Sequence, residues 1–372
     1  MFKRFLSAPI DWISLIVPII LTIVGVITIY TITFAQEKSG LATSQVIFAC
    51  IGLVAMVLAM FSDYRHLRTF ANVLYLLGVV TLILLIPLLA PKIPFALKIF
   101  GAYRWLNLGF FQLQPGEIFK LIAAIFGAKI LTQHIGLINW KKTLVYLFFA
   151  VVPILLVLFQ PDLGTASVIL VIFAAAFLTA RPSGRIVTTI LMVFLISLPL
   201  IWITLRPYQR DRVETLLNPS TDPQGQGYNV RQSLIAVGSG GLTGRGFGQG
   251  SQTVLNFLPV AHTDFVFSGF AEATGFVGSI VLIFLYLLLI YRAINIASIS
   301  TDKFGQLLAI AIASKFLFQV TVHVGMNLGL LPVTGIPLPF MSGGGTSLII
   351  DLLCVGILQS IHIRHARVGF RS

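Results

Sequence analysis

The sequence predicts an all-α polytopic membrane protein of about ten transmembrane helices, and three observations lead to this fold class. Hydrophobic residues make up 57% of the 372 residues and charged residues only 10%, whereas about 25% of the residues of a soluble globular domain are charged. The mean hydropathy is +0.97. Apolar runs of about 20 residues, the length that crosses a bilayer as a helix, recur along the whole chain.

Ten such runs are present, and one long polar segment separates the seventh from the eighth. The runs lie near residues 10–34, 44–61, 70–90, 116–132, 143–159, 163–180, 186–205, 265–291, 304–331 and 346–363. The first run is too long for a signal-peptide core and lacks a small-x-small cleavage signal, so we expect it to remain as a helix. The sequence therefore predicts a single integral membrane domain over residues 1–372, with a large extracytoplasmic loop at about 206–264.

The basic residues indicate which side of the membrane each loop faces. With the N-terminus placed in the cytoplasm, thirteen of the 25 Lys and Arg residues fall in short inner segments and nine in outer ones. Most of the outer nine lie in two longer loops, which count little in the positive-inside rule, so both termini are expected to be cytoplasmic. The net charge of +13 then reflects membrane topology, and nucleic acid is not an expected partner. Eight of the twelve acidic residues lie at or near the outer side, where we expect any carboxylate chemistry.

The long loop contains a glycine run at Gly244, Gly246, Gly248 and Gly250. No predicted strand precedes it and no Gly-Lys-Ser/Thr follows, so a nucleotide-binding loop, and with it a nucleotide cofactor, is not expected. Turns and close backbone approach are the favoured interpretation. Backbone N–H groups beside two arginines are nevertheless candidates for holding an anionic headgroup, namely near Arg231 and Arg245. The two cysteines, Cys50 and Cys354, lie in apolar runs, so a disulfide framework is not expected.

Polar clusters interrupt the apolar runs, and each has a structural and a functional interpretation. In QPGEIFKL at 114–121, Glu117 and Lys120 stand at i and i+3 at the start of a helix. An acid in a first turn often only interacts with the helix dipole, but Lys120 one turn deeper favours a polar cavity. In QPDLGT at 160–165, capping of the next helix is the better interpretation for Asp162.

Asp264 is the first candidate for chemistry, because a carboxylate at the edge of hydrocarbon is costly unless something pairs with it or uses it. It directly precedes an apolar run, so N-capping of the helix and catalysis are about equally supported by the pattern alone. Glu272, two turns into the same run, is harder to explain as a cap. We expect it to line a substrate cavity.

The ninth run carries a polar stripe, in which side chains recur every four residues at Lys315, Gln319, His323 and Asn327. This spacing places them on one slowly drifting face of a helix. A single His in such a run is usually a hydrogen-bonded core residue, whereas four polar side chains indicate a helix–helix network or a water-filled cleft. We therefore expect Lys315 and His323 to belong to the cavity.

These motifs together resemble a known family. QPGEIFKL, QPDLGT, GYNVRQSLIAVGSGGL, the HTDF segment and GLLPVTGIPLPFMSGGGTSL occur in the order and spacing typical of the SEDS family of shape, elongation, division and sporulation proteins. The resemblance covers the whole chain, and GRGFGQGSQ followed by LNFLP looks more like the elongation branch, RodA, than the division branch, FtsW. The chain departs from the family pattern at Gly116, Ala273 and Gly343, where Ser, an acid and Tyr are usual.

The resemblance implies a peptidoglycan glycosyltransferase of the bacterial cytoplasmic membrane. Such an enzyme polymerises lipid II on the outer face of the membrane and works with a class B penicillin-binding protein that crosslinks the product. By position, the resemblance also implies an essential role for Asp264 and roles for Glu117, Lys120 and Asp162. A lipid II flippase or another polyprenyl-lipid transporter is the alternative, since transporters also place polar residues and broken helices within the membrane.

The chemistry assigns separate tasks to these residues. An acceptor hydroxyl attacks the anomeric carbon of a sugar linked to a lipid diphosphate, so a base must take a proton, and Asp264 is the expected base. The leaving diphosphate needs charge neutralisation by basic groups, by a divalent cation such as Mg or Mn, or by both. The candidate basic groups are Lys120, Arg231 and Arg245.

Overall fold

Ten long helices form a bundle in the described part of the chain. The computed structural model describes residues 10–34, 39–99, 101–109, 111–132, 139–204, 207–217, 225–255, 257–258 and 260–369. The ten helices are α1 (Trp12–Phe34), α2 (Ser39–Phe61), α3 (Arg65–Leu84), α4 (Pro115–Thr132), α5 (Trp140–Phe159), α6 (Leu163–Thr179), α7 (Gly184–Thr204), α11 (Val266–Ile299), α12 (Lys303–Asn327) and α13 (Gly345–Gly369). Helices suit these apolar runs because a helix satisfies its backbone hydrogen bonds internally, as a lipid environment requires.

Seven of these helices are long and apolar enough to cross a bilayer by length and composition: α1, α2, α3, α5, α11, α12 and α13. Two others contain shorter apolar stretches, Leu163–Thr179 in α6 and Gly184–Ser197 in α7. The remaining helix, α4, carries three charged residues: Glu117, Lys120 and Lys129. All three are buried in protein. The prediction of an all-helical membrane bundle with about ten helices is therefore confirmed.

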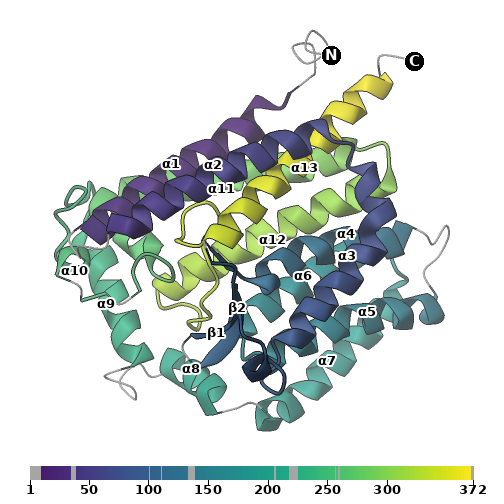
Figure 1. Cartoon of the computed structure of the whole chain (residues 1–372), viewed down its shortest axis with the longest axis horizontal. Coiled ribbons are helices and arrows are strands. Elements are labelled where there is room, and N and C mark those ends of the chain that lie inside the picture. Colours follow the sequence, from purple (N-terminus) through teal and green to yellow (C-terminus); the bar gives the residue numbers. More distant parts are fainter. Residues whose placement is uncertain are drawn as a thin grey trace.

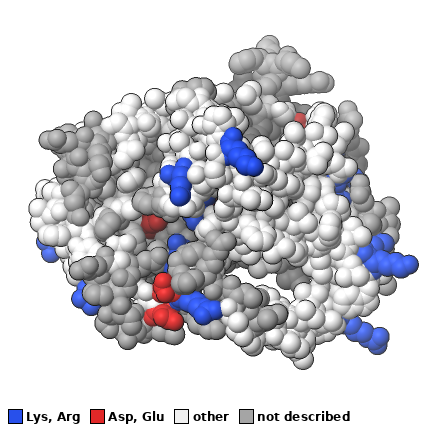
Figure 2. Space-filling model, turned by 60° about the horizontal axis from the view of Figure 1, so that its bottom comes forward, with Lys and Arg blue, Asp and Glu red and all other residues white. Residues whose placement is uncertain are grey.

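The arrangement places the most buried helices at the centre. The helix α4 is buried along nearly its whole length, and it contacts α3, α6, α12 and α13. Peripheral helices instead expose large apolar side chains such as Leu58 on α2, Leu76 on α3 and Phe148 on α5. On the face drawn in Figure 2, Lys and Arg are sparse on a mostly uncharged surface. A surface in contact with lipid has this composition.

A small β-sheet lies between α3 and α4, where the sequence prediction had only a loop. Its strands are β1 (Ala96–Ile99), β2 (Ala102–Asn107) and β3 (Gln112–Leu113), and they pair antiparallel in the order β1-β2-β3. Gly101 lies between β1 and β2 at φ +78°, a conformation that glycine adopts without strain. The all-α prediction missed this sheet because a window of 20 residues averages out strands of two to six residues.

The connections that carry further secondary structure lie at one end of the bundle, which we call the loop end. It comprises the sheet, a 3-10 turn (Ala90–Lys92), the short helices α8 (Pro207–Leu217), α9 (Gln226–Ser239) and α10 (Ser251–Val254), and the segment 328–344. In Figure 1 these elements lie at the lower left, and α1 begins and α13 ends at the opposite, upper right end. There the Gln359 side chain donates to the Asp11 backbone oxygen at 2.6 Å and accepts from the Asp11 backbone nitrogen at 3.2 Å, which ties α13 to the residue just before α1.

The helix α11 is broken near the loop end. Gly275 has φ 69° and ψ −164°, values outside the helical region. The turn after α9 fills the break: Phe276 N donates to Gly241 O at 2.9 Å, and Val277 N donates to Leu242 O at 3.1 Å. This contact needs glycine on both sides, because a Cβ on Gly275 would lie 2.3 Å from the backbone nitrogen of Gly244. Within the glycine run, Gly244 thus serves close backbone approach, and the positive φ angles of Gly244, Gly246 and Gly248 fit the turns that the sequence indicated.

Candidate functional site

Asp264 lies at the loop end, in the turn that leads into α11. Its backbone oxygen accepts a hydrogen bond from Asn327 Nδ2 at 3.0 Å, which anchors the turn to the last residue of α12. The N-cap position of α11 is Phe265, and no side chain caps the helix. The capping interpretation of Asp264 is therefore excluded, and its half-buried carboxylate is left for another role.

The electrostatic environment of Asp264 is mixed. Burial raises the pKa of the Asp264 carboxyl above its usual value. A hydrogen bond with Thr263 and the positive charges of Arg212 and Arg104 lower that pKa, whereas the negative charge of Asp162 raises it. Removal from water is the largest of these effects, so this carboxylate has a higher proton affinity than an exposed aspartate.

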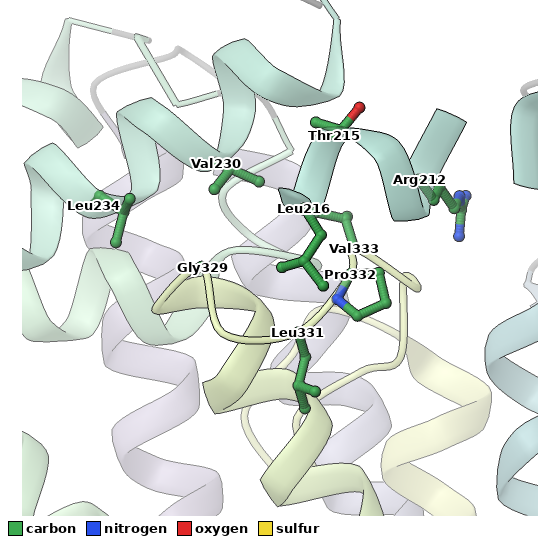
Figure 3. A pocket seen from close by; sticks show the side chains of 9 residues that line it. All are labelled: Arg212, Thr215, Leu216, Val230, Leu234, Gly329, Leu331, Pro332 and Val333. Atoms are coloured by element: carbon green, nitrogen blue, oxygen red, sulfur yellow. The ribbon is translucent and has the colours of Figure 1, made fainter. Parts of the chain in front are cut away.

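The two arginines come from elements remote in sequence. Arg104 lies on β2, where its Nε donates to Gln160 O at 3.1 Å and its Nη2 donates to Pro161 O. The sheet is thereby fastened to the corner between α5 and α6. Arg212 lies on α8, beside a small cleft of about 50 Å³. Figure 3 shows this cleft between α8, α9 and the segment 329–333, lined by Thr215, Leu216, Val230, Leu234, Gly329, Leu331, Pro332 and Val333.

The segment 334–336 connects Asp264 with the start of α6. A Cβ on Gly335 would be 3.6 Å from Asp264 Oδ2, and a Cβ on Gly164 would be 2.8 Å from Thr334 O. At the start of α6, Asp162 accepts hydrogen bonds from the backbone nitrogen and the hydroxyl of Thr165, each at 3.0 Å. The structure thus shows Asp162 as the N-cap of α6, within electrostatic range of Asp264.

Glu117 and Lys120 form a buried ion pair one layer further in. Lys120 Nζ donates to Glu117 Oε1 at 2.6 Å, and both side chains are almost fully excluded from solvent. A Cβ on Gly116 would be 3.1 Å from Thr165 Cγ2, so the first turn of α4 packs against the residue that Asp162 caps. The pair therefore lies next to the start of α6 and beneath the Asp264 region.

Two further predicted cavity residues lie within the helix bundle. Lys315 on α12 is paired with Asp351 on α13, and both are buried. His323 on α12 contacts the carbonyl of Ile336 through Nδ1 at 2.8 Å. Because a carbonyl only accepts, Nδ1 carries the hydrogen of this bond.

The remaining predicted residues do not gather around Asp264. Glu272 is fully buried and accepts from the backbone nitrogens of Gln252 at 2.8 Å and Thr253 at 3.1 Å, which makes it the cap of α10. Arg245 is exposed and donates from Nε to Ser239 O at 3.0 Å. Arg231 is exposed on α9. The described residues contain no group of three or more His, Cys, Asp or Glu side chains that could hold a metal ion.

A model of the cell cycle protein family, FtsW/RodA/SpoVE, matches residues 11–367 of the sequence. The chain belongs to the FtsW/RodA/SpoVE family. The predicted SEDS resemblance is thereby confirmed.

Relatives of this family member are known by sequence and by structure. It is 37% identical over 313 residues to the peptidoglycan glycosyltransferase MrdB of Escherichia coli K12, covering 84% of this chain and 83% of that protein. It is 34% identical over 366 residues to the stage V sporulation protein E of Bacillus subtilis 168, covering 94% and 96%. Its fold matches the crystal structure of Thermus thermophilus RodA with a TM-score of 0.70 at 28% identity, covering 95% and 97%.

A second solved structure matches more closely in geometry. It is described as showing structural coordination of polymerization and crosslinking by a peptidoglycan synthase complex. The TM-score is 0.79 at 28% identity, and the match covers 96% of this chain and 98% of that one. The match extends over nearly the whole chain, so this chain and that one share the fold of the whole bundle.

Sequence reasoning missed the two arginines whose charges lower the pKa of Asp264 in this FtsW/RodA/SpoVE protein. Arg104 lies ten residues before Gln114, the first residue of the motif that contains Glu117, which was a usable signal. Arg212 lies in RPYQRDR at 206–212, where nothing in the pattern distinguishes it from its basic neighbours. Only the fold brings α8 and β2 to the same carboxylate.

Proposed function

We propose that this chain is a peptidoglycan glycosyltransferase that polymerises lipid II into glycan strands, with Asp264 as the general base. The observation that carries the proposal is a half-buried carboxylate of raised pKa, placed at the loop end within electrostatic range of two arginines. The activity named for the Escherichia coli relative supports it. Membership of the family supports it as well.

The reaction requires proton removal from an acceptor hydroxyl as it attacks an anomeric carbon. A base works best when its pKa lies near the working pH. Burial moves the pKa of Asp264 in that direction. Arg104 and Arg212 favour the ionised form that accepts the proton, because both lower the pKa of Asp264.

The leaving lipid diphosphate is strongly anionic and needs cationic partners. Arg104 and Arg212 lie close enough to Asp264 to provide them, and Lys120 lies one layer further in. Arginine suits this task because its planar guanidinium binds phosphate oxygens in pairs. These residues replace Arg231 and Arg245, whose side chains are exposed elsewhere, as our main candidates.

A divalent cation fits this site only with ligands from the substrate. Asp162 uses both carboxylate oxygens on Thr165, which leaves Asp264 as the carboxylate that faces the site. One carboxylate is too few for a protein-only Mg or Mn site, but Mg commonly binds through one or two carboxylates together with substrate phosphates. Such an ion would neutralise the diphosphate, and Asp264 would bind it only in place of acting as the free base.

The cellular setting of the proposal follows from topology and from the family. We place the chain in the bacterial cytoplasmic membrane with both termini in the cytoplasm and the loop end outside, where lipid II and a class B penicillin-binding protein meet it. The structural match to a peptidoglycan synthase complex supports a transpeptidase partner. The RodA-like loop motif favours a role in cell elongation.

Purified protein in detergent, with the partner transpeptidase and lipid II, tests the proposal. We expect glycan polymer from the wild-type chain and none above background from Asp264→Asn. Detergent removes the two sides of the membrane, so a flippase gives no signal in this assay. Absence of polymer, together with lipid II flipping by the same protein in vesicles, would establish the transporter alternative.

A further inference from the structure

Three polar side chains inside the bundle have hydrogen-bonding atoms that nothing in the described part of the chain satisfies. They are Glu117 through Oε2, Gln319 through both atoms of its amide, and His323 through Nε2. Exposure of these side chains is 3% or less. Leaving such groups bare inside a protein is strongly unfavourable, so buried polar groups nearly always have a partner.

The three side chains lie close in depth. The helices α4 and α13 start at the same depth from the loop end. Thr346, in the first turn of α13, bonds through Oγ1 to Gln114 N and Gln112 O, each at 3.2 Å, and these two residues stand just before α4. Asp351 then lies about one and a half turns inward along α13, and Lys120 is about equally deep along α4. Because Asp351 pairs with Lys315, Lys315 on α12 lies at about the same depth in the bundle as Lys120 on α4.

Gln319 lies one turn closer to the loop end than Lys315 on α12. Glu117 likewise lies about one turn closer to the loop end than Lys120 on α4. The helices α4 and α12 are in contact, so Gln319 and Glu117 lie at the same level across that contact. His323 is one turn further out, where Ile336 holds its ring. Ile336 in turn packs against Gly164, beside the residue that meets Gly116. These registers place Glu117, Gln319 and His323 in one region between α4, α6 and α12.

The chemistry of these atoms determines what can occupy the region. Glu117 Oε2 and Gln319 Oε1 are acceptors, and Gln319 Nε2 is a donor. His323 Nε2 accepts when the ring is neutral, because Nδ1 then carries the only ring hydrogen on nitrogen. The two neighbouring ion pairs are already balanced, since Glu117 is matched with Lys120 and Asp351 with Lys315. An additional cation would bring an uncompensated charge near two lysines. Water donates twice and accepts as well, and it commonly fills buried sites that offer two to four polar partners.

We propose that Glu117, Gln319 and His323 bind a cluster of ordered water between α4 and α12. The water gives Glu117 a second partner besides Lys120. Lys120 can therefore turn toward an anionic group without leaving a bare carboxylate behind. This last consequence rests on the proposed function, in which Lys120 helps to neutralise a diphosphate, whereas the water site itself does not.

A structure of the full chain at a resolution that shows water tests the site directly. We expect ordered density about 2.7–3.2 Å from Glu117 Oε2 and from the Gln319 amide. Side chains packed together without density between them would overturn the proposal. Density at about 2.3–2.6 Å from several oxygens, the distance at which Ca²⁺ binds, would identify a cation and overturn it as well.

Thermal unfolding gives a second test, in which the sign of the change decides. If the Gln319 amide is hydrated, Gln319→Met removes water ligands and lowers the midpoint of unfolding. If the amide is dry and unbonded, the same change removes an unfavourable group and raises the midpoint. In the variant Gln319→Met with His323→Phe, shared water also predicts a decrease smaller than the sum of the two single decreases. A raised midpoint or full additivity would contradict the proposal.

A functional arm separates this proposal from the previous one. In the polymerisation assay we expect Gln319→Met to lose activity and Gln319→Asn, which keeps an amide within reach of water, to retain most of it. If the wild-type chain makes no polymer, the proposed function fails, and the structural and unfolding measurements still decide the water site. If the wild-type chain is active and Gln319→Asn loses as much activity as Gln319→Met, loss of bound water at Gln319 does not explain the loss of activity, and the proposal is overturned.

Discussion

At the scale of single residues, the properties of Asp264 depend on groups supplied by four separate segments. Arg104 comes from the sheet, Arg212 from α8, Asp162 from the start of α6 and Asn327 from the end of α12. Burial raises the proton affinity of the carboxylate and the arginines limit the rise. Each of these contributions can be removed separately by substitution.

Replacing the base gives the simplest prediction at this scale. Asp264→Asn keeps the size and removes the proton acceptor, so we expect the rate of polymerisation to fall by about 10²–10⁴-fold, the usual contribution of a general base. Chain length on gels after a fixed reaction time measures it. Asp211→Asn, on the exposed face of α8, is the matched control and should leave the rate unchanged.

The arginine on α8 should set the pH range of activity. Arg212 lowers the pKa of Asp264, so Arg212→Gln raises that pKa further. The base is then protonated at a higher pH, and the loss of kcat on the acid side begins at a higher pH than in the wild type. A pH–rate profile of both proteins measures the shift. An acid limb that stays in place or moves to lower pH would refute the assignment of Asp264 as the titrating base.

Much of the site could be predicted from sequence, and the limits have physical causes. Asp264, Glu117, Lys120 and Asp162 stand in motifs whose local spacing shows a helix start or a corner. Arg104 and Arg212 were missed as site residues because their relevance depends on tertiary contacts between a sheet and a loop helix. Glu272 was expected in a substrate cavity, and the structure shows that its carboxylate caps α10, a contact made between residues twenty positions apart.

At the scale of elements, the loop after α9 and the broken helix α11 act as one unit. Arg245 N donates to Glu272 O at 3.0 Å and Gly246 N donates to Ala273 O at 2.9 Å, next to the bonds that fill the break at Gly275. Backbone groups freed by the break thus find partners in the loop, as buried backbone requires. The loop end is consequently held in place by main-chain contacts as well as by side chains.

A single methyl group should disrupt this unit. At Gly275 it meets the backbone of Gly244 at 2.3 Å and requires a positive φ, so we expect Gly275→Ala to lower the thermal midpoint strongly or to prevent recovery of folded protein. At Gly238, on α9, a Cβ has no atom within 4 Å. Gly238→Ala should therefore be neutral or slightly stabilising. Size-exclusion chromatography and unfolding in detergent compare the two, and equal behaviour would contradict the packing described.

The cap on α10 gives a second test of elements. Glu272→Gln retains the shape but weakens two bonds from backbone nitrogens, and hydrogen bonds to a charged group contribute about 1.5–3 kcal/mol each at most. We expect faster limited proteolysis in the segment 250–258 and a lower thermal midpoint. Glu214→Gln on α8 removes an exposed carboxylate and serves as the control. Identical proteolysis of both variants would show that the cap is dispensable.

At the scale of the whole molecule, one buried ion pair joins two central helices and a second lies within a neighbouring helix. Lys315 links α12 to α13, and Lys120 with Glu117 lies on the neighbouring α4. Removing one member of a buried pair leaves a bare charge, at a cost of about 3–5 kcal/mol, whereas removing both is often nearly neutral. The pairing therefore predicts how the single and double variants compare in stability, and it does not by itself predict a more stable wild type.

Four proteins test this pattern. We expect Lys315→Met and Asp351→Leu each to lower the thermal midpoint, and the double variant to recover most of the loss. Thermal unfolding in one detergent at one pH measures all four, including the wild type. Additive losses in the double variant would show that the two side chains act independently.

The tie between Gln359 and the residue before α1 has a practical consequence for work in cells. Because ten helices cross the bundle and α1 begins where α13 ends, a reporter fused to either end of the chain should face the same compartment. A reporter inserted at Gly248, in an exposed turn of the loop end, should face the other one. Fluorescent and phosphatase fusions at these three positions would thus assign the sides of the membrane without any assay of catalysis.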